Sequence, residues 1–225
     1  SFRRYQRLRP LTIALLRGLT HILAASRQDL MRFRELNWPG ATIEMKGNLK
    51  FDFDLSETLT NDQRDHWKNQ LKLNRSRILV GASTWPGEEA MLIEALARLQ
   101  AVGQEVQLLI VPRHAERKPQ LQSLLEESAI KYDFSYHFRS DSNSIESPVD
   151  IYIADTTGEL RSMIQLADLA FIGKSLPPHT DGQTPIEAGV FGIPMVFGPG
   201  MANFRDVARS LLRNRVAEGV ADRES

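Results

Sequence analysis

One segment late in the 225-residue chain has the residue types and spacing of a nucleotide site. An apolar run from Leu169 to Ile172 enters a turn rich in Gly, Pro and Ser, and a helix is predicted to begin at Thr184, with Pro185 at its first position and Glu187 in its first turn. Free backbone N–H groups at a helix start bind phosphate or hydroxyl groups, and a carboxylate in that turn can accept hydrogen bonds from a ribose diol. The segment therefore predicts binding of a nucleotide-activated small molecule.

Other loops carry comparable chemistry after predicted strands. The hydroxyl groups of Ser83 and Thr84 precede a predicted helix, where they either contact phosphate or sugar or form a helix cap together with Glu88. Pro112 and Arg113 end another strand. An Arg at such a point is well placed to meet a phosphate, unless it is a surface residue without a role.

A further loop, from Asp155 to Leu160, again runs from a strand end into a helix start. Its N–H groups either hold a base edge or a phosphate, or belong to a well-capped helix. His179 in the Pro-rich loop is a weaker candidate for catalysis, because a lone loop histidine is more often inert.

The elements that position these loops alternate from residue 77 onward. Strands are predicted at 78–82, 106–111, 132–138, 151–154, 169–172 and 194–197. Helices are predicted at 86–100, 119–129, 159–166, 184–191 and 204–213. This alternation predicts an α/β fold with a doubly wound parallel sheet, in which ligands bind beyond the carboxyl ends of the strands. The loops at 82–88, 112–118, 154–159 and 172–184 then share one edge.

Before residue 77 the predicted elements do not alternate in this regular way. Helices are predicted at 11–25 and 29–36, a short strand at 43–45 and a polar helix at 62–74. The pattern breaks at Gly47, where a Gly-Asn pair is followed by charges. We therefore expect the end of one domain at 1–46, a junction at 47–75 and a second domain at 76–225, in a chain that is an internal piece of a longer protein.

The amino-acid composition excludes several kinds of site and indicates possible partners. The absence of cysteine excludes disulfides, thiolate zinc sites and cysteine nucleophiles, and no apolar run approaches the roughly 20 residues that span a bilayer. The net charge of zero hides an excess of seven positive charges in residues 1–50. This basic segment suits an anionic partner such as a membrane surface, a phosphorylated lipid or a nucleic acid, or it is a solvated helix face.

Several common signatures are missing from the sequence. It contains no G-x-G-x-x-G, Walker, G-x-S-x-G or H-E-x-x-H motif, which argues against a dehydrogenase, an ATPase, a serine hydrolase and a zincin. Asp52 and Asp54 have the D-x-D spacing of metal-dependent sugar transferases of another fold, but they lie at the junction rather than at a strand end within the sheet. We predict no metal site and no cofactor.

Five strings occur in the order Gly47–Asp52, Pro112–His114, Asp155–Leu160, Gly173–Leu176 and Gly182–Glu187. Together they resemble the bacterial 3-deoxy-D-manno-octulosonic acid (Kdo) transferases of lipopolysaccharide synthesis. The resemblance covers nearly all of the chain. It implies the GT-B fold, with two Rossmann-like halves, of which this chain would supply the end of the first and most of the second, donor-binding half.

The resemblance also implies a reaction. The family transfers Kdo from CMP-Kdo to a phosphorylated lipid A precursor, with inversion and without a metal, at the cytoplasmic face of the inner membrane. Its general base is a Glu in the first half, expected upstream of Ser1, so we assign no catalytic residue to this chain and expect it to be inactive alone. The basic segment would face the lipid acceptor or anionic lipids. The donor contacts that we expect are Ser83, Thr84, Pro112, Arg113, Thr157, Gly158, Glu159, Ser175, Thr184, Pro185, Ile186 and Glu187.

The sequence departs from the family pattern at several places. Trp85-Pro86 stands where His is usual, and Thr184 stands where Asn is usual. The loop 177–181 is one residue longer, and Ala188-Gly189 replaces Pro-Ala. These changes bear on the exact donor contacts.

Two other functions stay open. One is a different GT-B enzyme, a UDP-sugar transferase or epimerase, that shares only the Glu in the first helical turn. The other is a non-catalytic nucleotide-binding module. A nucleic-acid binder is disfavoured, because the basic segment lacks interleaved exposed aromatic residues and matches no motif of that class.

Overall fold

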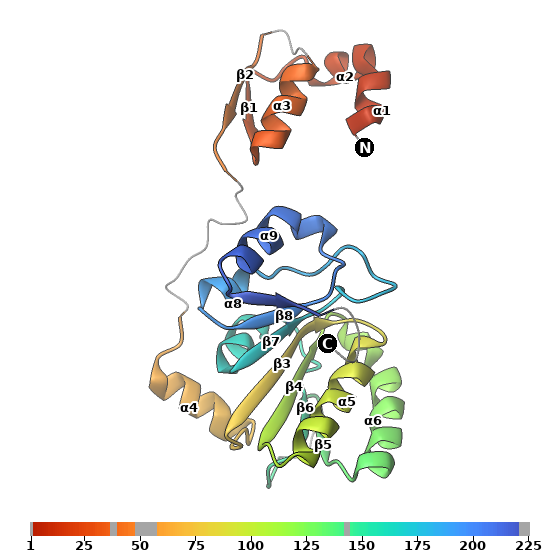
Figure 1. The fold of residues 1–225 in the computed structure, drawn as a ribbon, viewed down its shortest axis with the longest axis vertical. Coiled ribbons are helices and arrows are strands. Elements are labelled where there is room, and N and C mark those ends of the chain that lie inside the picture. Colours follow the sequence, from red (N-terminus) through yellow and green to blue (C-terminus); the bar gives the residue numbers. More distant parts are fainter. Residues whose placement is uncertain (1, 37–39, 48–57, 142–144, 221–225) are drawn as a thin grey trace. The chain divides into compact units, whose positions relative to one another are not determined.

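The computed structural model describes residues 2–36, 40–47, 58–141 and 145–220, and it divides the chain into two compact units, Ser1–Asp54 and Leu55–Ser225 (Figure 1). Each unit is described by itself. Most of the string Gly47–Asp52 and the pair Asp52 and Asp54 lie outside the described residues.

The first unit is a small α/β unit. Its elements are α1 (Phe2–Arg7), α2 (Arg9–Leu16), β1 (His21–Ala24), α3 (Arg27–Glu35) and β2 (Thr42–Met45). The strands β1 and β2 pair in parallel. The predicted strand at 43–45 and helix at 29–36 are confirmed. The α3 helix begins where the Ser26 hydroxyl accepts a hydrogen bond from the Asp29 N–H at 3.1 Å.

The predicted helix at 11–25 is wrong beyond residue 16. The segment leaves the helix before Gly18, and residues 21–24 form β1. Ile22 and Ala24 are buried while His21 and Leu23 are exposed. Apolar residues that alternate in this way also fit part of a helical pattern. The apolar positions alone therefore did not distinguish a helix from a strand.

The second unit is built on one sheet. Within the described residues, seven parallel strands lie in the order β5-β6-β4-β3-β7-β8-β9. They are β3 (Arg77–Thr84), β4 (Val106–Pro112), β5 (Tyr136–Phe138), β6 (Ile151–Ile153), β7 (Leu169–Ile172), β8 (Met195–Phe197) and β9 (Ala217–Gly219). The predicted α/β fold with a parallel sheet is confirmed.

Helices cover the sheet on both faces (Figure 1). The helices α5 (Glu88–Ala101) and α6 (Lys118–Tyr132) pack on one face. On the other face lie α4 (Asn61–Gln70), α7 (Leu160–Met163), α8 (Ile186–Val190) and α9 (Arg205–Arg213), with the 3₁₀ turns η3 (Ala115–Arg117), η4 (Ile164–Leu166) and η5 (Ala202–Phe204) in the connections. Alternate residues of each strand therefore enter different cores, as Leu79 and its neighbours Ile78 and Val80 do.

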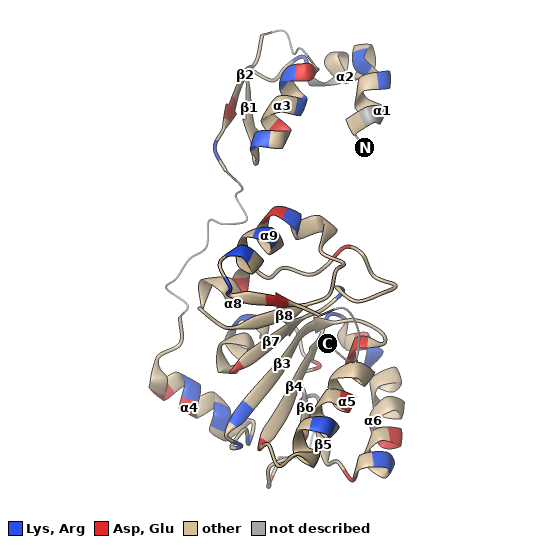
Figure 2. Cartoon of the chain, in the orientation of Figure 1, with Lys and Arg blue, Asp and Glu red and all other residues tan. Residues whose placement is uncertain are grey.

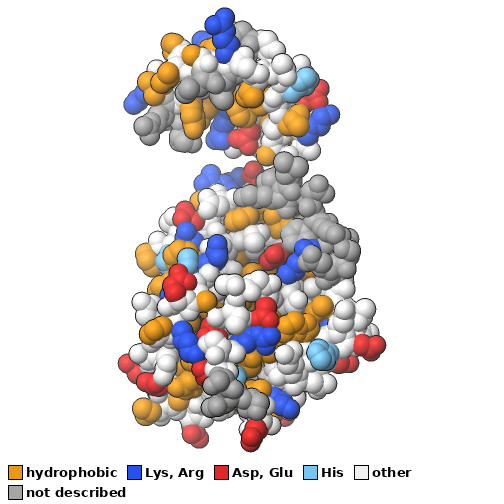
Figure 3. Space-filling view, turned by 180° about the vertical axis from the view of Figure 1, so that it is seen from behind, with side chains coloured by type: hydrophobic (Ala, Val, Ile, Leu, Met, Phe, Trp, Pro, Cys, Tyr) orange, Lys and Arg blue, Asp and Glu red, His pale blue; other side chains and the backbone are white. Residues whose placement is uncertain are grey.

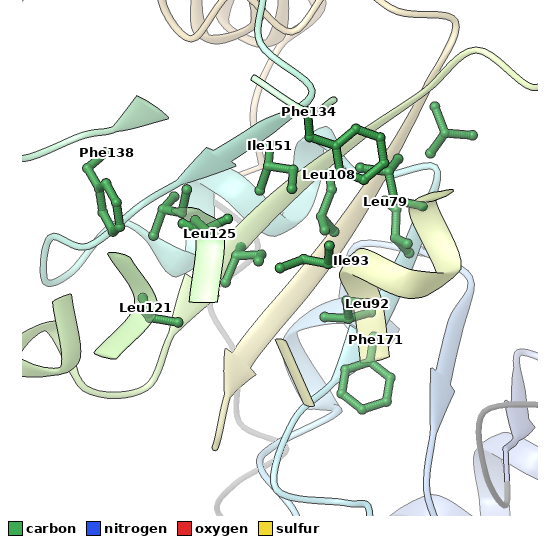
Figure 4. Packing of buried hydrophobic residues seen from close by; sticks show 14 of the residues in the cluster. Leu79, Leu92, Ile93, Leu108, Leu121, Leu125, Phe134, Phe138, Ile151 and Phe171 are labelled. Atoms are coloured by element: carbon green, nitrogen blue, oxygen red, sulfur yellow. The ribbon is translucent and has the colours of Figure 1, made fainter. Parts of the chain in front are cut away.

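The core beneath α5 and α6 is shown in Figure 4. Leu92 and Ile93 of α5 and Leu125 of α6 pack there against Leu108 of β4 and Ile151 of β6. Charged residues instead lie mainly on helices and loops (Figure 2). From behind, hydrophobic and charged side chains are interspersed on the surface (Figure 3). The buried sheet gives the loops at its carboxyl edge a rigid support.

Some predicted elements are shorter than expected. The strand predicted at 132–138 is only Tyr136–Phe138, because α6 continues to Tyr132 and Asp133 follows with a φ of 58°. The helix predicted at 62–74 ends at Gln70. The segment 159–166 forms the short helix α7 followed by the turn η4.

Candidate ligand-binding site

The site predicted from sequence lies where the direction of winding changes. From β3 the chain moves to β4 on one side, whereas β7 pairs with the other side of β3. In open α/β sheets the crevice for ligands forms at such a point, beyond the carboxyl ends of the strands. All twelve predicted donor contacts lie at the ends of β3 and β4 or in the segments that follow β4, β6 and β7.

The ends of β3 and β7 approach each other closely. Gly173, directly after β7, donates its N–H to the Ala82 carbonyl at 2.9 Å. A Cβ at position 173 would lie 2.3 Å from the Ser83 carbonyl oxygen, so only glycine fits there. Ser83 and Lys174 face this junction with φ angles of 54° and 55°, which non-glycine residues rarely adopt. The two loops are therefore held in a constrained arrangement.

Glu88 joins these two loops. Its carboxylate is buried and accepts the N–H groups of Trp85 at 2.9 Å, Lys174 at 2.8 Å, Ser175 at 2.9 Å and Leu176 at 3.3 Å. The alternative of a helix cap formed by Ser83 or Thr84 with Glu88 is wrong, because the N-cap of α5 is Gly87, with a φ of 95° and no side-chain cap. The Glu88 carboxylate instead accepts three N–H groups of a distant loop together with the nearby N–H of Trp85.

The end of β3 is also tied to the end of β4. The Thr84 carbonyl accepts the Arg113 N–H at 3.1 Å. It also accepts from the guanidinium of Arg117 at 3.4 Å, which in turn pairs with both oxygens of the buried Glu89 at 2.7 and 3.3 Å. The Arg113 side chain is exposed and has no ion pair in the described part of the chain. Its backbone is thus fixed while its guanidinium faces solvent.

Trp85 is surrounded by cationic or titratable side chains. The Lys174 ammonium lies 4.5 Å from the centre of its ring and pairs with Asp181 at 3.0 Å. The rings of His114 and His179 meet the indole edge-on, with centroid distances of 5.2 and 5.4 Å. Trp85 therefore packs against side chains of two other loops, 112–118 and 172–184, and His179 takes part in this packing.

The loop after β6 is organised by Arg139. Its guanidinium holds both oxygens of Glu159 at 2.6 Å and stacks on the Trp67 ring of α4 at 5.3 Å. The Thr156 hydroxyl donates to the same carboxylate. Gly158 has a φ of 87°. Since the Glu159 carboxylate is engaged, the backbone of this loop is its more accessible binding group.

Residues 184–187 lie at the start of the helix α8. The helix predicted from Thr184 begins instead at Ile186, and Pro185 is its N-cap. The Thr184 hydroxyl accepts the Ile186 N–H at 3.3 Å, and Pro185 and Ile186 are buried. Glu187 lies in the first turn, as predicted.

Ser175 faces the interior. It is fully buried, its hydroxyl donates to the Ile172 carbonyl at 2.6 Å, and it accepts the Gly198 N–H at 2.9 Å. Ser175 therefore connects the loops after β7 and β8 through its side chain.

A cavity of about 720 Å³ lies beside these loops. Its walls include Pro178 and His179 of one loop, Gly198 and Met201 of the next, and Arg205 of α9. The cavity is mostly apolar with a cationic rim. Within the described residues, no group of three His, Asp or Glu side chains is placed to hold a metal ion. No helix in that part of the chain is long and apolar enough to cross a bilayer.

Sequence reasoning missed Lys174, Glu88 as a loop anchor, and Arg139. Lys174 lies within the string Gly173–Leu176, in which only Ser175 is predicted as a donor contact. Glu88 fits the pattern of a local helix start, but three of its four partners lie 86 to 88 residues further along the chain. Arg139 pairs with Glu159 across neighbouring strands, and nothing in the local sequence marks that pair.

Comparison with known proteins agrees with the predicted resemblance. Residues 1–53 match the family profile described as 3-deoxy-D-manno-octulosonic-acid transferase. The chain is similar to the crystal structure of the C-terminal CMP-Kdo binding domain of WaaA from Acinetobacter baumannii. That match has a TM-score of 0.62 and 28% identity, over 72% of this chain and 82% of that one.

The chain is similar in sequence to Kdo transferases. Curated relatives include the Kdo transferase of Haemophilus influenzae, 30% identical over 80% of this chain and 41% of that protein. The Kdo transferase of Rickettsia conorii is 29% identical over 90% of this chain and 41% of that protein. A bifunctional glycosyltransferase/methyltransferase of Fusobacterium nucleatum is 26% identical over 96% of this chain and 32% of that protein. The chain thus spans less than half the length of these Kdo transferase relatives.

The fold is that of a GT-B glycosyltransferase half. A UDP-forming trehalose-phosphate synthase from Burkholderia vietnamiensis shares it with a TM-score of 0.51 and 8% identity, over 97% of this chain and 51% of that one. At that identity the likeness concerns the fold alone. The predicted Rossmann-like, GT-B-type fold is confirmed.

Proposed function

We propose that this chain is the donor-binding part of a Kdo transferase of lipopolysaccharide synthesis, and that it binds CMP-Kdo. The similarity of this chain to a CMP-Kdo binding domain, over 82% of that domain, carries the proposal. The gathering of the predicted donor contacts at one edge of the sheet supports it independently. Domain boundaries at 46 and 76, with a junction between, remain part of this proposal.

The donor would bind across the ends of β3, β4, β6 and β7. The exposed Arg113 guanidinium would meet the phosphate of CMP, and the backbone of Thr157 and Gly158 would contact the nucleotide. Glu187 would accept hydrogen bonds from the ribose. A cation that is already positioned stabilises the charge that develops on a departing phosphate, and this is a major contribution in such displacements.

The reaction would be a direct displacement at the anomeric carbon of Kdo. CMP would leave with the bonding electron pair, and the acceptor hydroxyl would attack from the opposite face, which inverts the configuration without a metal. The general base would lie outside residues 1–225, so these residues alone would bind the donor without transferring it.

The acceptor would be a phosphorylated lipid A precursor at the cytoplasmic face of the inner membrane. Charge supports this part of the proposal, because residues 1–50 carry ten Lys and Arg against three acidic residues. Figure 2 marks Lys and Arg positions in blue on α1 and α3. Exposed apolar residues of the same unit, Leu8, Leu11 and Leu23, would add contacts with acyl chains.

Calorimetry with CMP, UMP and UDP tests the donor assignment. We expect CMP to bind more tightly than the uridine nucleotides, and Arg113→Ala and Glu187→Ala to weaken CMP binding. Arg98→Ala is the matched control, because Arg98 is an exposed residue near the far end of α5. Preferential binding of UDP would contradict the proposal and favour a UDP-sugar enzyme.

A further inference from the structure

We propose that Glu88 is a positioning residue of the donor site. Its buried carboxylate sets the loop Lys174–Leu176 and the backbone of Trp85 in the arrangement that binds the donor. The inference rests on the proposed function, since it concerns the same edge of the sheet.

The two oxygens of Glu88 divide their partners between the two loops. Oε2 accepts the N–H groups of Trp85 and Lys174 at 2.9 and 2.8 Å, and Oε1 accepts those of Ser175 and Leu176 at 2.9 and 3.3 Å. Only an ionised carboxylate offers two acceptor oxygens and no donor. Glu88 therefore matches a set of four N–H donors that no other side chain satisfies.

The charge of Glu88 is balanced by these N–H groups rather than by a cation. The residue is 2% exposed, and in the described part of the chain no Lys, Arg or His lies within ion-pair distance of it. The neighbouring Glu89, equally buried, instead pairs with Arg117. Loss of the Glu88 carboxylate would therefore act on the loop backbone directly.

The loop that Glu88 holds presents Lys174 at the junction of β3 and β7. Lys174 has a φ of 55°, an unfavourable conformation for a residue with a Cβ, and its N–H is one of the four that Glu88 accepts. Its ammonium lies over the ring of Trp85, and the backbone N–H of Trp85 is another of the four. Glu88 thus fixes both partners of this cation–aromatic contact by their backbones.

Substitution by glutamine separates hydrogen bonding from side-chain size. In Glu88→Gln the amide NH₂ replaces one oxygen, so whichever way the amide turns, it faces two backbone N–H groups within 3.3 Å. Two donors then oppose each other, and the loop or Trp85 must move.

Asp150 provides a matched control at the other edge of the sheet. It precedes β6, is 9% exposed, and accepts the N–H and hydroxyl of Ser135 at 2.9 and 2.7 Å. Asp150→Asn therefore also removes a buried acceptor of backbone hydrogen bonds, but it leaves the carboxyl edge untouched.

The experiment compares the 225-residue chain with Glu88→Gln and Asp150→Asn. The readouts are CMP affinity by calorimetry, amide hydrogen exchange at residues 174–176, and Trp85 fluorescence with Trp38 and Trp67 replaced by Phe. For Glu88→Gln we expect CMP to bind at least about tenfold more weakly, faster exchange at those amides and a shifted Trp85 emission. For Asp150→Asn we expect lower thermal stability with all three readouts unchanged.

Wild-type CMP affinity and wild-type exchange at 174–176 in Glu88→Gln would overturn the proposal. If Glu88→Gln does not fold, Glu88→Asp decides, because its shorter carboxylate cannot reach both loops, and wild-type CMP affinity in that variant would equally overturn the proposal. If the wild-type chain binds no CMP, the proposed function fails. Exchange and fluorescence, measured without ligand, then still decide whether Glu88 positions the loop.

Discussion

Replacing Gly173 by alanine would force apart the ends of β3 and β7. The new Cβ would lie 2.3 Å from the Ser83 carbonyl oxygen, 2.7 Å from the Ser83 carbonyl carbon and 2.8 Å from the Thr84 Cα. All three are backbone atoms, so no side-chain rotation relieves the overlap. Overpacking of this kind costs about 1–3 kcal/mol. For a unit of this size, a loss of about 2 kcal/mol lowers the melting temperature by about 4–8 °C.

Gly189→Ala in α8 is the control for this prediction. Its Cβ would lie 3.5 Å from Leu211 Cδ2 and 3.8 Å from Met195 Cε, which are ordinary contacts. Alanine in a helix is favoured over glycine by about 0.5–1 kcal/mol, so this variant should melt at or above the wild-type temperature. Scanning calorimetry measures both, and CMP titration should show weaker binding in Gly173→Ala alone. A Gly173→Ala variant with wild-type melting temperature and CMP affinity would refute the close approach of the two loops.

Three further predictions concern the second unit. Leu108→Ala leaves a cavity at a fully buried position and should lower the free energy of unfolding, measured with urea, by about 3 kcal/mol. A decrease below about 1 kcal/mol would contradict the described core. A lysine at position 139 cannot bind both oxygens of Glu159, so we expect Arg139→Lys to lower the free energy of unfolding by about 1–2 kcal/mol and to weaken CMP binding. Wild-type stability together with wild-type CMP affinity would argue against the role of Arg139 in organising the loop after β6. Burial alone would raise the pKa of Asp150, but hydrogen bonds from Ser135 and the Arg75 charge outweigh burial and lower it. Asp150 therefore contributes stability above its ordinary pKa of 3.8, and this contribution is lost as the pH falls further. The stability difference from Asp150→Asn should shrink in that range, whereas a constant difference down to about pH 2 would contradict the assignment.

The sheet was predictable because its strands are buried on both faces. The run Leu169–Ile172 was predicted with its observed bounds, since a continuous apolar run between turn residues has few other structures in an α/β pattern. Segments whose apolar residues fit two periods were not predictable. Residues 21–24 form a strand because β2 pairs with them, and that pairing is not a property of the segment itself.

The common edge of the four predicted loops was predictable, but the contacts among them were not. The rule that places these loops at one edge needs only that the strands run parallel. The role of Glu88 depends on N–H groups 86 to 88 residues away, which the local pattern of a helix start does not reveal. Likewise, Glu159 was expected to face the ligand, whereas Arg139 holds its carboxylate from a neighbouring strand end.

Mapping the CMP contact by NMR tests the central claim most directly. On titration of the isotope-labelled chain with CMP, the account predicts the largest amide shifts in residues 83–88, 112–114, 157–159 and 173–187, at the carboxyl edge of the sheet. Amides at the opposite edge, such as Asp150, should stay unchanged. Shifts concentrated at that opposite edge, or no saturable shifts at all, would contradict the account.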